Sequence, residues 1–360
     1  MSENNGKSPE PLNISGWVCP APLRHYPTVV LGHGSGGKMT NDLIANLFAP
    51  ILQNDLLDQY GDSTLFELAG QGRLAMSTDS FVINPLFFPG GSIGELAING
   101  TVNDIAMSGA TPLHLTAGFI LEEGLPMQDL ARIVADFGKA AQAANVRVIA
   151  ADTKVVNKGH GDGLFINTTG IGIVPPNVNI AADQARPGDV ILVSGTVGDH
   201  GMAIMSVREG LSFDSVIQSD TAPLIDMVQA MLAVTPEIHC LRDATRGGLA
   251  AVLNELASAS GVGMVFDEAK VPVTLAVESA CEMLGLDPFY VANEGKLVAV
   301  VPREHADAVL EAMRRSPYGE NATIIGEVVD AHPRIVTART RIGAQRVVDL
   351  PAGDLLPRIC

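Results

Sequence analysis

The sequence predicts a two-domain α/β fold, because strand-like and helix-like segments alternate along it and a proline-rich break divides it near the middle. The chain has 360 residues, 47% of them apolar and 18% charged, which is enough for two substantial cores. We expect folded domains at residues 29–176 and 186–344, preceded by an irregular leader at residues 1–28 and followed by a mobile C-terminal tail at residues 345–360.

The first domain is expected to contain four strands and two helices. Runs of apolar and β-branched residues predict the strands, at residues 73–83, 112–121, 146–154 and 164–174. Apolar residues at helical spacing predict the helices, at residues 93–106 and 129–144. Strands with helices interposed make an α/β domain.

The second domain is expected to be α/β or α+β. Prolines and glycines at residues 174–177 and 185–189 separate it from the first domain. Its predicted strands lie at residues 190–194, 263–266, 296–301 and 322–328. Its predicted helices lie at residues 221–233, 246–259 and 273–284.

Charge and cysteine content narrow the class of protein. The net charge is −17 and the pI is near 4.8, which argues against a nucleic-acid surface, because neutralising phosphates needs clustered Lys and Arg. Cys19, Cys240, Cys281 and Cys360 lie far apart without a C-x-x-C pair, which favours reduced thiols over disulfides or a zinc site. The sequence shows neither a signal peptide nor a run of about 18 apolar residues. We expect a cytoplasmic protein that does not bind membranes.

The chain ends in a thiol, in the sequence Pro357-Arg358-Ile359-Cys360. Pro351 and Pro357 disfavour a helix, so we expect an extended arm that carries the nucleophilic Cys360 into an active site. An incidental surface cysteine is the alternative interpretation, since one position reveals neither burial nor reactivity. Prenylation is excluded because it requires a cysteine four residues from the end.

A glycine-rich loop follows the first strand-like run. Gly34, Gly36, Gly37 and Lys38 precede a helix, an arrangement in which backbone N–H groups can hold phosphate. The loop does not fit a dinucleotide fold, which needs a second strand ending in an acid, and Met39 replaces the Ser or Thr of a P-loop. A glycine turn without a ligand stays open, but we favour a loop that covers a nucleotide in another fold.

Several acids interrupt otherwise apolar segments. Asp79 lies in a predicted strand, Asn103 and Asp104 in a predicted helix, and Asp152 near the end of another strand. Apolar segments do not bury charge without a partner, and carboxylates from separate elements suit Mg²⁺, which completes its shell with water and phosphate. Helix caps or surface ion pairs are the alternative for each acid taken singly.

A further acid and an arginine precede a helix in the second domain. Asp243 and Arg246 stand just before residues 247–259, where a helix N-terminus favours anionic phosphate. Gly198-Asp199-His200-Gly201 is a weaker signal of the same kind, because a single histidine is more often structural. Together with the acids of the first domain, these residues predict a site for Mg²⁺ and an anionic phosphate group.

The chain resembles the HypE family of hydrogenase maturation proteins, within the aminoimidazole-ribonucleotide-synthetase (PurM)-like superfamily. The resemblance extends over residues 29–360, and the leader with Cys19 falls outside it. The segments that carry it are residues 31–39, 77–91, 99–106, 118–126, 151–156, 242–248 and 292–297 and the terminal Pro-Arg-Ile-Cys.

The resemblance implies a PurM-like two-domain fold in which the N-terminal sheets of two subunits form a barrel across a homodimer, with ATP between the domains. It implies an ATP-dependent carbamoyl dehydratase. A carbamoyltransferase, HypF, loads Cys360, and the loaded group is dehydrated to a thiocyanate. The cyano group then passes to iron in the HypC–HypD scaffold complex, for the [NiFe]-hydrogenase centre.

The resemblance also implies roles for individual residues. Lys154 and Glu294 match the family's residues for deprotonation, and a buried Lys–Glu pair would shift both pKa values toward proton transfer. A phosphate contact for Lys154 and a turn or cap for Glu294 are the alternatives. The implied ATP contacts are Gly34, Gly36, Gly37, Lys38, Asp79, Asn103, Asp152, Asp243 and Arg246. The implied Mg²⁺ ligands are Asp79, Asp104, Asp152 and Asp243.

Two other functions fit parts of the sequence. A selenophosphate synthetase or thiamine-phosphate kinase of the same superfamily would share the ATP site but would leave the terminal thiol unexplained. A carrier that only accepts the carbamoyl group would need Cys360 but not Asp79, Asp152 or Glu294. ATP turnover discriminates the carrier from an enzyme.

Overall fold

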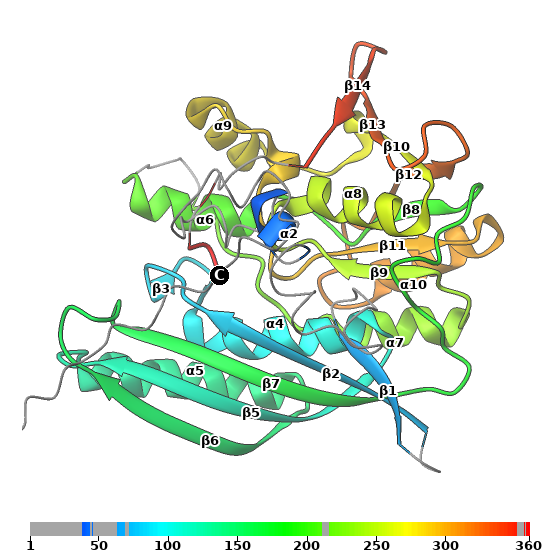
Figure 1. Cartoon of the computed structure of the whole chain (residues 1–360). Helices are drawn as coiled ribbons and strands as arrows, with labels where there is room; N and C mark the ends of the chain where they lie inside the picture. The colour runs from blue at the N-terminus through cyan, green and yellow to red at the C-terminus, as the bar shows by residue number, and fades with distance from the viewer. Residues whose placement is uncertain are drawn as a thin grey trace, which may run out of the picture.

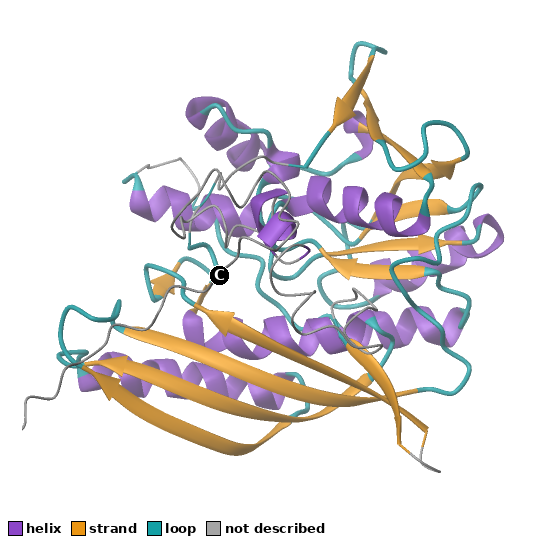
Figure 2. Cartoon of the chain, in the orientation of Figure 1, coloured by secondary structure: helices purple, strands orange, loops and turns teal. Residues whose placement is uncertain are grey.

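Two sheets organise the structure, one in each half of the chain (Figure 1). The computed structural model describes residues 38–43, 45, 63–68, 72–210, 216–350, 356 and 358–360. In these ranges a five-stranded sheet has the order β1-β2-β7-β5-β6 and a seven-stranded sheet the order β14-β13-β10-β12-β8-β11-β9. Helices lie on both sheets (Figure 2). The described helices include none that is long and apolar enough to cross a membrane.

The N-terminal sheet is antiparallel except at one edge, where β5 and β6 run parallel and α5 connects them. Its strands are β1 (Thr64–Leu68), β2 (Gly72–Phe81), β5 (Thr111–Glu122), β6 (Arg147–Val156) and β7 (Leu164–Val174). The helices of this half are α2 (Lys38–Leu43), α4 (Ile93–Met107) and α5 (Met127–Ala143), and a short ribbon is formed by β3 (Phe87–Phe88) and β4 (Gly91–Ser92).

One face of this sheet is covered and the other is open. Along β2, Ala75 and Phe81 are buried, and α4 and α5 pack on that face. On the opposite face Met76, Ile120 and Ile173 are 43%, 45% and 48% exposed. The helices lie to one side of the sheet in Figure 1. A sheet with an apolar uncovered face is a surface that a further layer can cover.

The C-terminal sheet is antiparallel apart from the pair β10 and β13. Its strands are β8 (Val190–Val193), β9 (Cys240–Asp243), β10 (Gly263–Asp267), β11 (Leu297–Val301), β12 (Thr323–Val329), β13 (Val336–Arg339) and β14 (Gln345–Val348). The helices of this half are α6 (Asp199–Arg208), α7 (Ile225–Val234), α8 (Gly248–Ser260), α9 (Leu275–Leu284) and α10 (Ala306–Arg315).

Both faces of the central C-terminal strands are buried, which explains their uninterrupted apolar sequence. In β8, Val190 and Leu192 join the core that includes α4, α7 and α10. Ile191 and Val193 point the other way, into a second core with α8. The first core is continuous with the core of the N-terminal sheet, so α4 is packed between the two sheets.

The strands and helices predicted for the first domain are all present, within a few residues of the predicted ends. In the second half, α6, α10, β9 and β13 were not predicted. The tail was expected to begin at residue 345, but residues 345–348 are β14, paired with β13. Val348 is fully buried in that pairing while Val347 is 63% exposed, and a four-residue alternation is too short to identify from sequence.

Candidate functional site

The end of the chain is seated inside the molecule, where Figure 1 marks the C-terminus between the two halves. Ile359 and Cys360 are 2% and 8% exposed. An oxygen of the terminal carboxylate of Cys360 accepts a hydrogen bond from the Val82 N–H at 3.1 Å, just beyond β2. The Ile359 carbonyl lies 2.8 Å from Nε2 of His200, on α6. The terminal thiol is therefore held between the two domains.

Arg246 is the cation next to this thiol. Its Nε donates to Cys360 Sγ at 3.0 Å, from the turn that precedes α8. Burial raises the pKa of Cys360 to about 12; Arg246 opposes that shift, whereas Glu294 and Asp79 add to it. A seated Cys360 is thus a protonated, weakly nucleophilic thiol at neutral pH.

Glu294 is a buried carboxyl near the thiol of Cys360. It is 3% exposed, and its Oε1 has no hydrogen-bond partner among the described residues. Burial raises its pKa well above the ordinary value, with further increases from Asp243, Asp79 and Asp220, and Arg246 offsets part of the increase. A carboxyl with a raised pKa binds its proton more tightly than an exposed glutamate does, and the unused oxygen is available for proton exchange with a bound group.

The backbone around Glu294 is fixed from two sides. Its N–H donates to Asp220 Oδ1 at 3.0 Å, and its carbonyl accepts from Asn103 Nδ2 at 3.3 Å. Asn103 also bonds the backbone of Ala222 and Leu224. Asn103, predicted to contact ATP, is fully buried and uses its amide on these backbone groups. In this structure it holds Glu294 in place.

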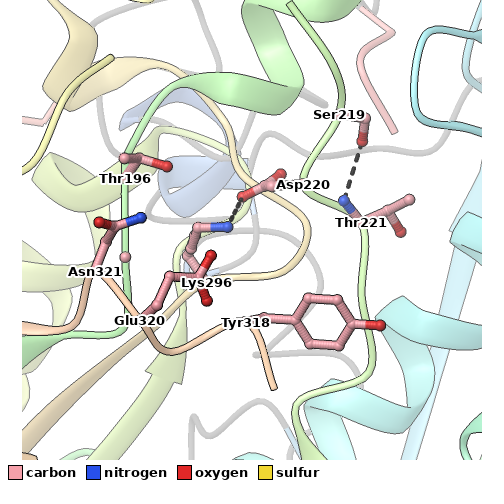
Figure 3. Close-up of a pocket in the computed structure, with 9 residues that line it drawn as sticks. Thr196, Ser219, Asp220, Thr221, Lys296, Tyr318, Glu320 and Asn321 are labelled. Carbon is pink, nitrogen blue, oxygen red and sulfur yellow. Dashed lines mark hydrogen bonds and ion pairs between the residues drawn. The ribbon is translucent and has the colours of Figure 1, made fainter. Parts of the chain in front are cut away.

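A polar pocket of about 150 Å³ adjoins this segment (Figure 3). Asp220 Oδ2 and Lys296 Nζ form an ion pair of 3.2 Å there, and both side chains are less than 10% exposed. The pocket is lined by Gly195, Thr196, Ser219, Asp220, Thr221, Lys296, Tyr318, Glu320 and Asn321. Cys360 and Glu294 do not line it, so the ion pair lies between the pocket and the buried site.

The sequence analysis missed Asp220 and Lys296. A signal existed for Lys296, since a lysine immediately before the apolar strand β11 must find a partner if it is buried. Asp220 gave little signal, because it lies in an irregular polar segment, where acids are commonly exposed.

Asp79 and Asp104 lie on the covered face of the N-terminal sheet, at its contact with α4. Asp79 Oδ1 accepts from the Ser80 N–H at 2.7 Å, and Asp104 Oδ2 accepts from Ser77 Oγ at 2.6 Å. Burial raises the pKa of Asp79, with Arg246 offsetting part of the shift. Gly100 of α4 leaves room for the ring of Phe81, since a Cβ there would come within 2.9 Å of it.

Asp152 and Lys154 lie on the opposite face. Residues paired across neighbouring strands lie on the same face of a sheet. The register pairs Ser80 with Asn167, Asn167 with Gly118, and Gly118 with Asp152. Asp152 is therefore on the open face with Ser80, whereas Asp79 is on the covered face. Lys154 Nζ pairs with Asp152 Oδ2 at 2.6 Å, and both side chains are about 70% exposed.

The expected buried Lys154–Glu294 pair is therefore not formed within one chain. Glu294 is enclosed, whereas Lys154 is exposed on the edge strand β6. The physical reason is strand parity: residues 152 and 154 share a face that no helix of the described chain covers.

The remaining predicted residues lie apart from this cluster or outside the described ranges. Gly34, Gly36 and Gly37 are outside the described residues, and Lys38 begins α2 with an exposed side chain. Asp243 is buried in β9, near Glu294. Within the described ranges, no group of three or more His, Cys, Asp or Glu side chains could hold a metal ion. Asp79 and Asp104 are still oxygen donors of the kind that Mg²⁺ takes when phosphate and water supply the other ligands.

Two family models match the chain. The model for the N-terminal domain of AIR synthase related proteins matches residues 60–174, and the model for the C-terminal domain matches residues 186–338. The carbamoyl dehydratase HypE of Azotobacter vinelandii is 57% identical over 92% of this chain and 97% of its own length. The carbamoyl dehydratase HypE of Escherichia coli K12 is 48% identical, over 92% of this chain and 99% of its own.

Solved structures show the same likeness. HypE from a HypE–HypF complex has a TM-score of 0.82 at 48% identity, over 86% of this chain and 99% of its own. The hydrogenase maturation protein HypE in complex with ATP has a TM-score of 0.79 at 47% identity, over 92% of this chain and 100% of its own. A thiamine monophosphate kinase from Aquifex aeolicus, at 20% identity and a TM-score of 0.62, over 84% of this chain and 97% of its own, shares the fold.

The buried state of Glu294 gives a testable dependence of stability on pH. Because its pKa is raised in the folded protein, the native state holds a proton that the unfolded chain releases. Its contribution to stability is thus fully present below about pH 4.3 and is lost as the pH rises through the raised pKa. Glu294→Gln, which stays neutral, should raise the unfolding free energy at pH 8.

Urea unfolding at pH 8 and near pH 4.5 measures this effect, and the difference between the two proteins should shrink at the lower pH. The exposed Glu304 provides the matched control, since Glu304→Gln should change stability little at either pH. An equal or lower stability of Glu294→Gln at pH 8 would contradict the buried-carboxyl assignment.

Proposed function

The chain belongs to the AIR synthase related family and, within it, to the HypE carbamoyl dehydratases of hydrogenase maturation, and we propose that its substrate is an S-carbamoyl group on its own Cys360. The observation that carries this proposal is the seating of Cys360 beside Arg246 and Glu294. A thiol that served only as a surface contact would not need a buried base as its neighbour.

The chemistry explains why the site needs ATP and a base. The oxygen of a thiocarbamate, S–C(=O)–NH₂, is a poor leaving group until a phosphoryl group from ATP is attached to it. Loss of that oxygen as phosphate, together with both N–H protons, leaves S–C≡N. The products are a thiocyanate on Cys360, ADP, phosphate and a proton: of the two protons that leave nitrogen, ionised Glu294 is placed to take one and the departing phosphate can carry the other.

Two positions of the tail follow from the pKa of Cys360. In its seat the thiol has a pKa of about 12 and is a poor acceptor, so the carbamoyl group must be loaded while the tail is outside. The carbamoyltransferase HypF is the proposed donor, which the relative crystallised in a HypE–HypF complex supports. A HypC–HypD complex is the proposed acceptor of the cyano group.

Asp79, Asp104 and Arg246 are proposed to face the phosphates of ATP. ATP binding is supported by the relative crystallised with ATP. Asp79 and Asp104 would hold Mg²⁺, whose charge would neutralise the phosphate oxygens during transfer. Asp243 would contribute from β9, and Gly34, Gly36, Gly37 and Lys38 would lie over the nucleotide. Arg246 would also keep the thiol oriented.

A homodimer is proposed to cover the open face of the N-terminal sheet. That face exposes Met76, Ile120 and Ile173, and the edge strand β6 is exposed along almost its whole length. Covering it with a second copy would remove these apolar groups from water and desolvate Lys154, which one chain alone leaves exposed. Lys154 and Asp152 would act only in that assembly. The buried free thiols of Cys240 and Cys281 fit a reducing compartment, so we place the protein in the cytoplasm.

The function is tested by separating loading from dehydration. Glu294→Gln keeps the shape of the side chain but removes the base, so it should bind ATP and accept the carbamoyl group normally. Its single-turnover conversion to thiocyanate should fall by roughly 10² to 10⁴. Cys360→Ala should gain no carbamoyl mass, and Glu304→Gln should behave as wild type. Conversion by Glu294→Gln at the wild-type rate would remove Glu294 from proton transfer and favour another base.

The dimer is tested on the open face. Ile173→Asp places a charge where a second sheet would pack, and Ile342→Asp is the matched control at a position of the C-terminal domain that is 91% exposed. Sedimentation should show a dimer for the wild type and the control and a monomer for Ile173→Asp. A wild-type monomer at micromolar concentration would contradict the proposal.

A further inference from the structure

We propose that the buried Asn99 of α4 binds the NH₂ of the carbamoyl group on Cys360 and orients it toward Glu294. The identity of the bound group rests on the function proposed above, and Asn99 adds a second protein contact to its nitrogen. Asn99 is a positioning residue in this role. Its neutral amide oxygen accepts a hydrogen bond but does not take the proton, which is left to Glu294.

Two buried oxygens near the terminal thiol lack a hydrogen-bond donor. Asn99 and Glu294 are each 3% exposed. Oδ1 of Asn99 and Oε1 of Glu294 have no hydrogen-bond partner among the described residues. A buried acceptor without a donor costs free energy, so each such oxygen in a folded protein calls for an explanation. A bound group with N–H bonds would supply the donors that both oxygens lack.

Shared contacts bring Asn99 and Glu294 to the same place. Asn103 lies one turn further along the same face of α4 and donates to the Glu294 carbonyl at 3.3 Å. Asn99 donates from Nδ2 to Thr221 Oγ1 at 3.2 Å. The Glu294 N–H donates at 3.0 Å to Oδ1 of Asp220, the residue before Thr221 (Figure 3). The two side chains with unused oxygens are thus tied to consecutive residues of one segment.

The neighbouring Gly100 shows that this part of α4 lies close to the terminal thiol. A Cβ added to Gly100 would be 3.6 Å from Asp79 Oδ2. The charges of Asp79 and Glu294 both act on Cys360 and raise the pKa of its thiol. A group carried on this sulfur therefore enters the region in which Asn99 and Glu294 have unused oxygens.

The NH₂ of a carbamoyl group matches two acceptors. Its nitrogen lone pair is delocalised into the carbonyl, so the nitrogen offers two N–H donors and accepts nothing. If Glu294 accepted from one N–H alone, the other would be buried without a partner. Asn99 Oδ1 satisfies this second N–H and fixes the plane of the group, so that the first N–H stays directed at Glu294.

The alternative is that Asn99 is purely structural and only holds Thr221 in place. Thr221→Val breaks the same side-chain hydrogen bond but keeps the oxygen of Asn99. The structural role therefore predicts equal effects of Thr221→Val and Asn99→Leu, whereas the proposal predicts a much larger effect of Asn99→Leu. Asn99→Asp keeps an acceptor oxygen and can accept from the Thr221 hydroxyl, so it should preserve the contact with the NH₂.

The first experiment needs neither ATP nor a carbamoyltransferase. Cyanate, as HNCO, adds across the S–H bond of a thiol, and ¹⁵N-labelled cyanate gives S–C(=O)–¹⁵NH₂ on Cys360 of the full-length protein. Peptide mass confirms the loading, and Cys360→Ala treated in the same way is the blank.

Exchange of the labelled NH₂ protons with water is then followed by NMR. In the wild type it should be at least roughly tenfold slower than in a carbamoylated peptide of the tail, because both N–H groups are bonded. Asn99→Leu should lose roughly tenfold in this protection. Asn99→Asp and Thr221→Val should keep it, and Asn177→Leu, at an exposed asparagine, is the matched control.

The second experiment measures conversion to thiocyanate by intact mass, in a single turnover of the loaded protein at saturating ATP. Asn99→Leu should convert roughly 10- to 100-fold more slowly, because its N–H is no longer held toward Glu294. Asn99→Asp, Thr221→Val and Asn177→Leu should stay within roughly threefold of the wild type.

The outcomes separate this proposal from the function on which it rests. Exchange in the wild type as fast as in the peptide, full protection in Asn99→Leu, or equal losses in Asn99→Leu and Thr221→Val would each overturn the proposal. Loss of protection in Asn99→Asp would also overturn it. If exchange responds as expected but the wild type forms no thiocyanate with ATP, the contact stands and the proposed function fails. If Asn99→Leu converts at the wild-type rate, the function stands and the role of Asn99 fails.

Discussion

One arginine, Arg246, faces three acidic groups at a largely buried site. Asp79, Glu294 and Cys360 all have pKa values raised by burial, and each shift is partly offset by Arg246. A single cation cannot balance three buried negative charges, so the site holds protons in place of charges. Glu294 can accept a proton from a substrate only after it has given up its own, and the raised pKa makes it a stronger base once it is ionised.

The same constraint separates the seated thiol from the step that loads it. A fixed cysteine with a pKa of about 12 would be protected from side reactions but could not be loaded efficiently. A terminal tail lets one thiol be reactive in solvent and protonated in its seat. Contacts with Val82, His200 and Asp162 hold the last three residues of the tail in their buried position. A few residues earlier, β14 fixes the chain to the C-terminal sheet.

Much of the fold could be predicted from sequence, because β2, β7, α4 and α5 have clear periodicities and occur where expected. The site could be predicted only in part. Asp79 and Asp152 both interrupt strands, but the sequence does not say which face of each strand packs on the core. The register of the four strands places the two acids on opposite faces of the sheet. Asn103, predicted as an ATP contact, donates from its buried amide to backbone carbonyls of the other domain, which the sequence did not indicate. The ion pair of Asp220 and Lys296 depends on two segments far apart in sequence and could not be predicted locally.

The most direct test of the account is the mass carried by Cys360. The full-length protein is incubated with the carbamoyltransferase and its substrates, freed of them, and then given ATP and Mg²⁺, with intact and peptide mass recorded at each stage. The account predicts a carbamoyl increment on the C-terminal peptide that becomes a cyano increment only after ATP is added. A carbamoyl increment that ATP leaves unchanged, or an increment located on Cys240 or Cys281, would contradict it.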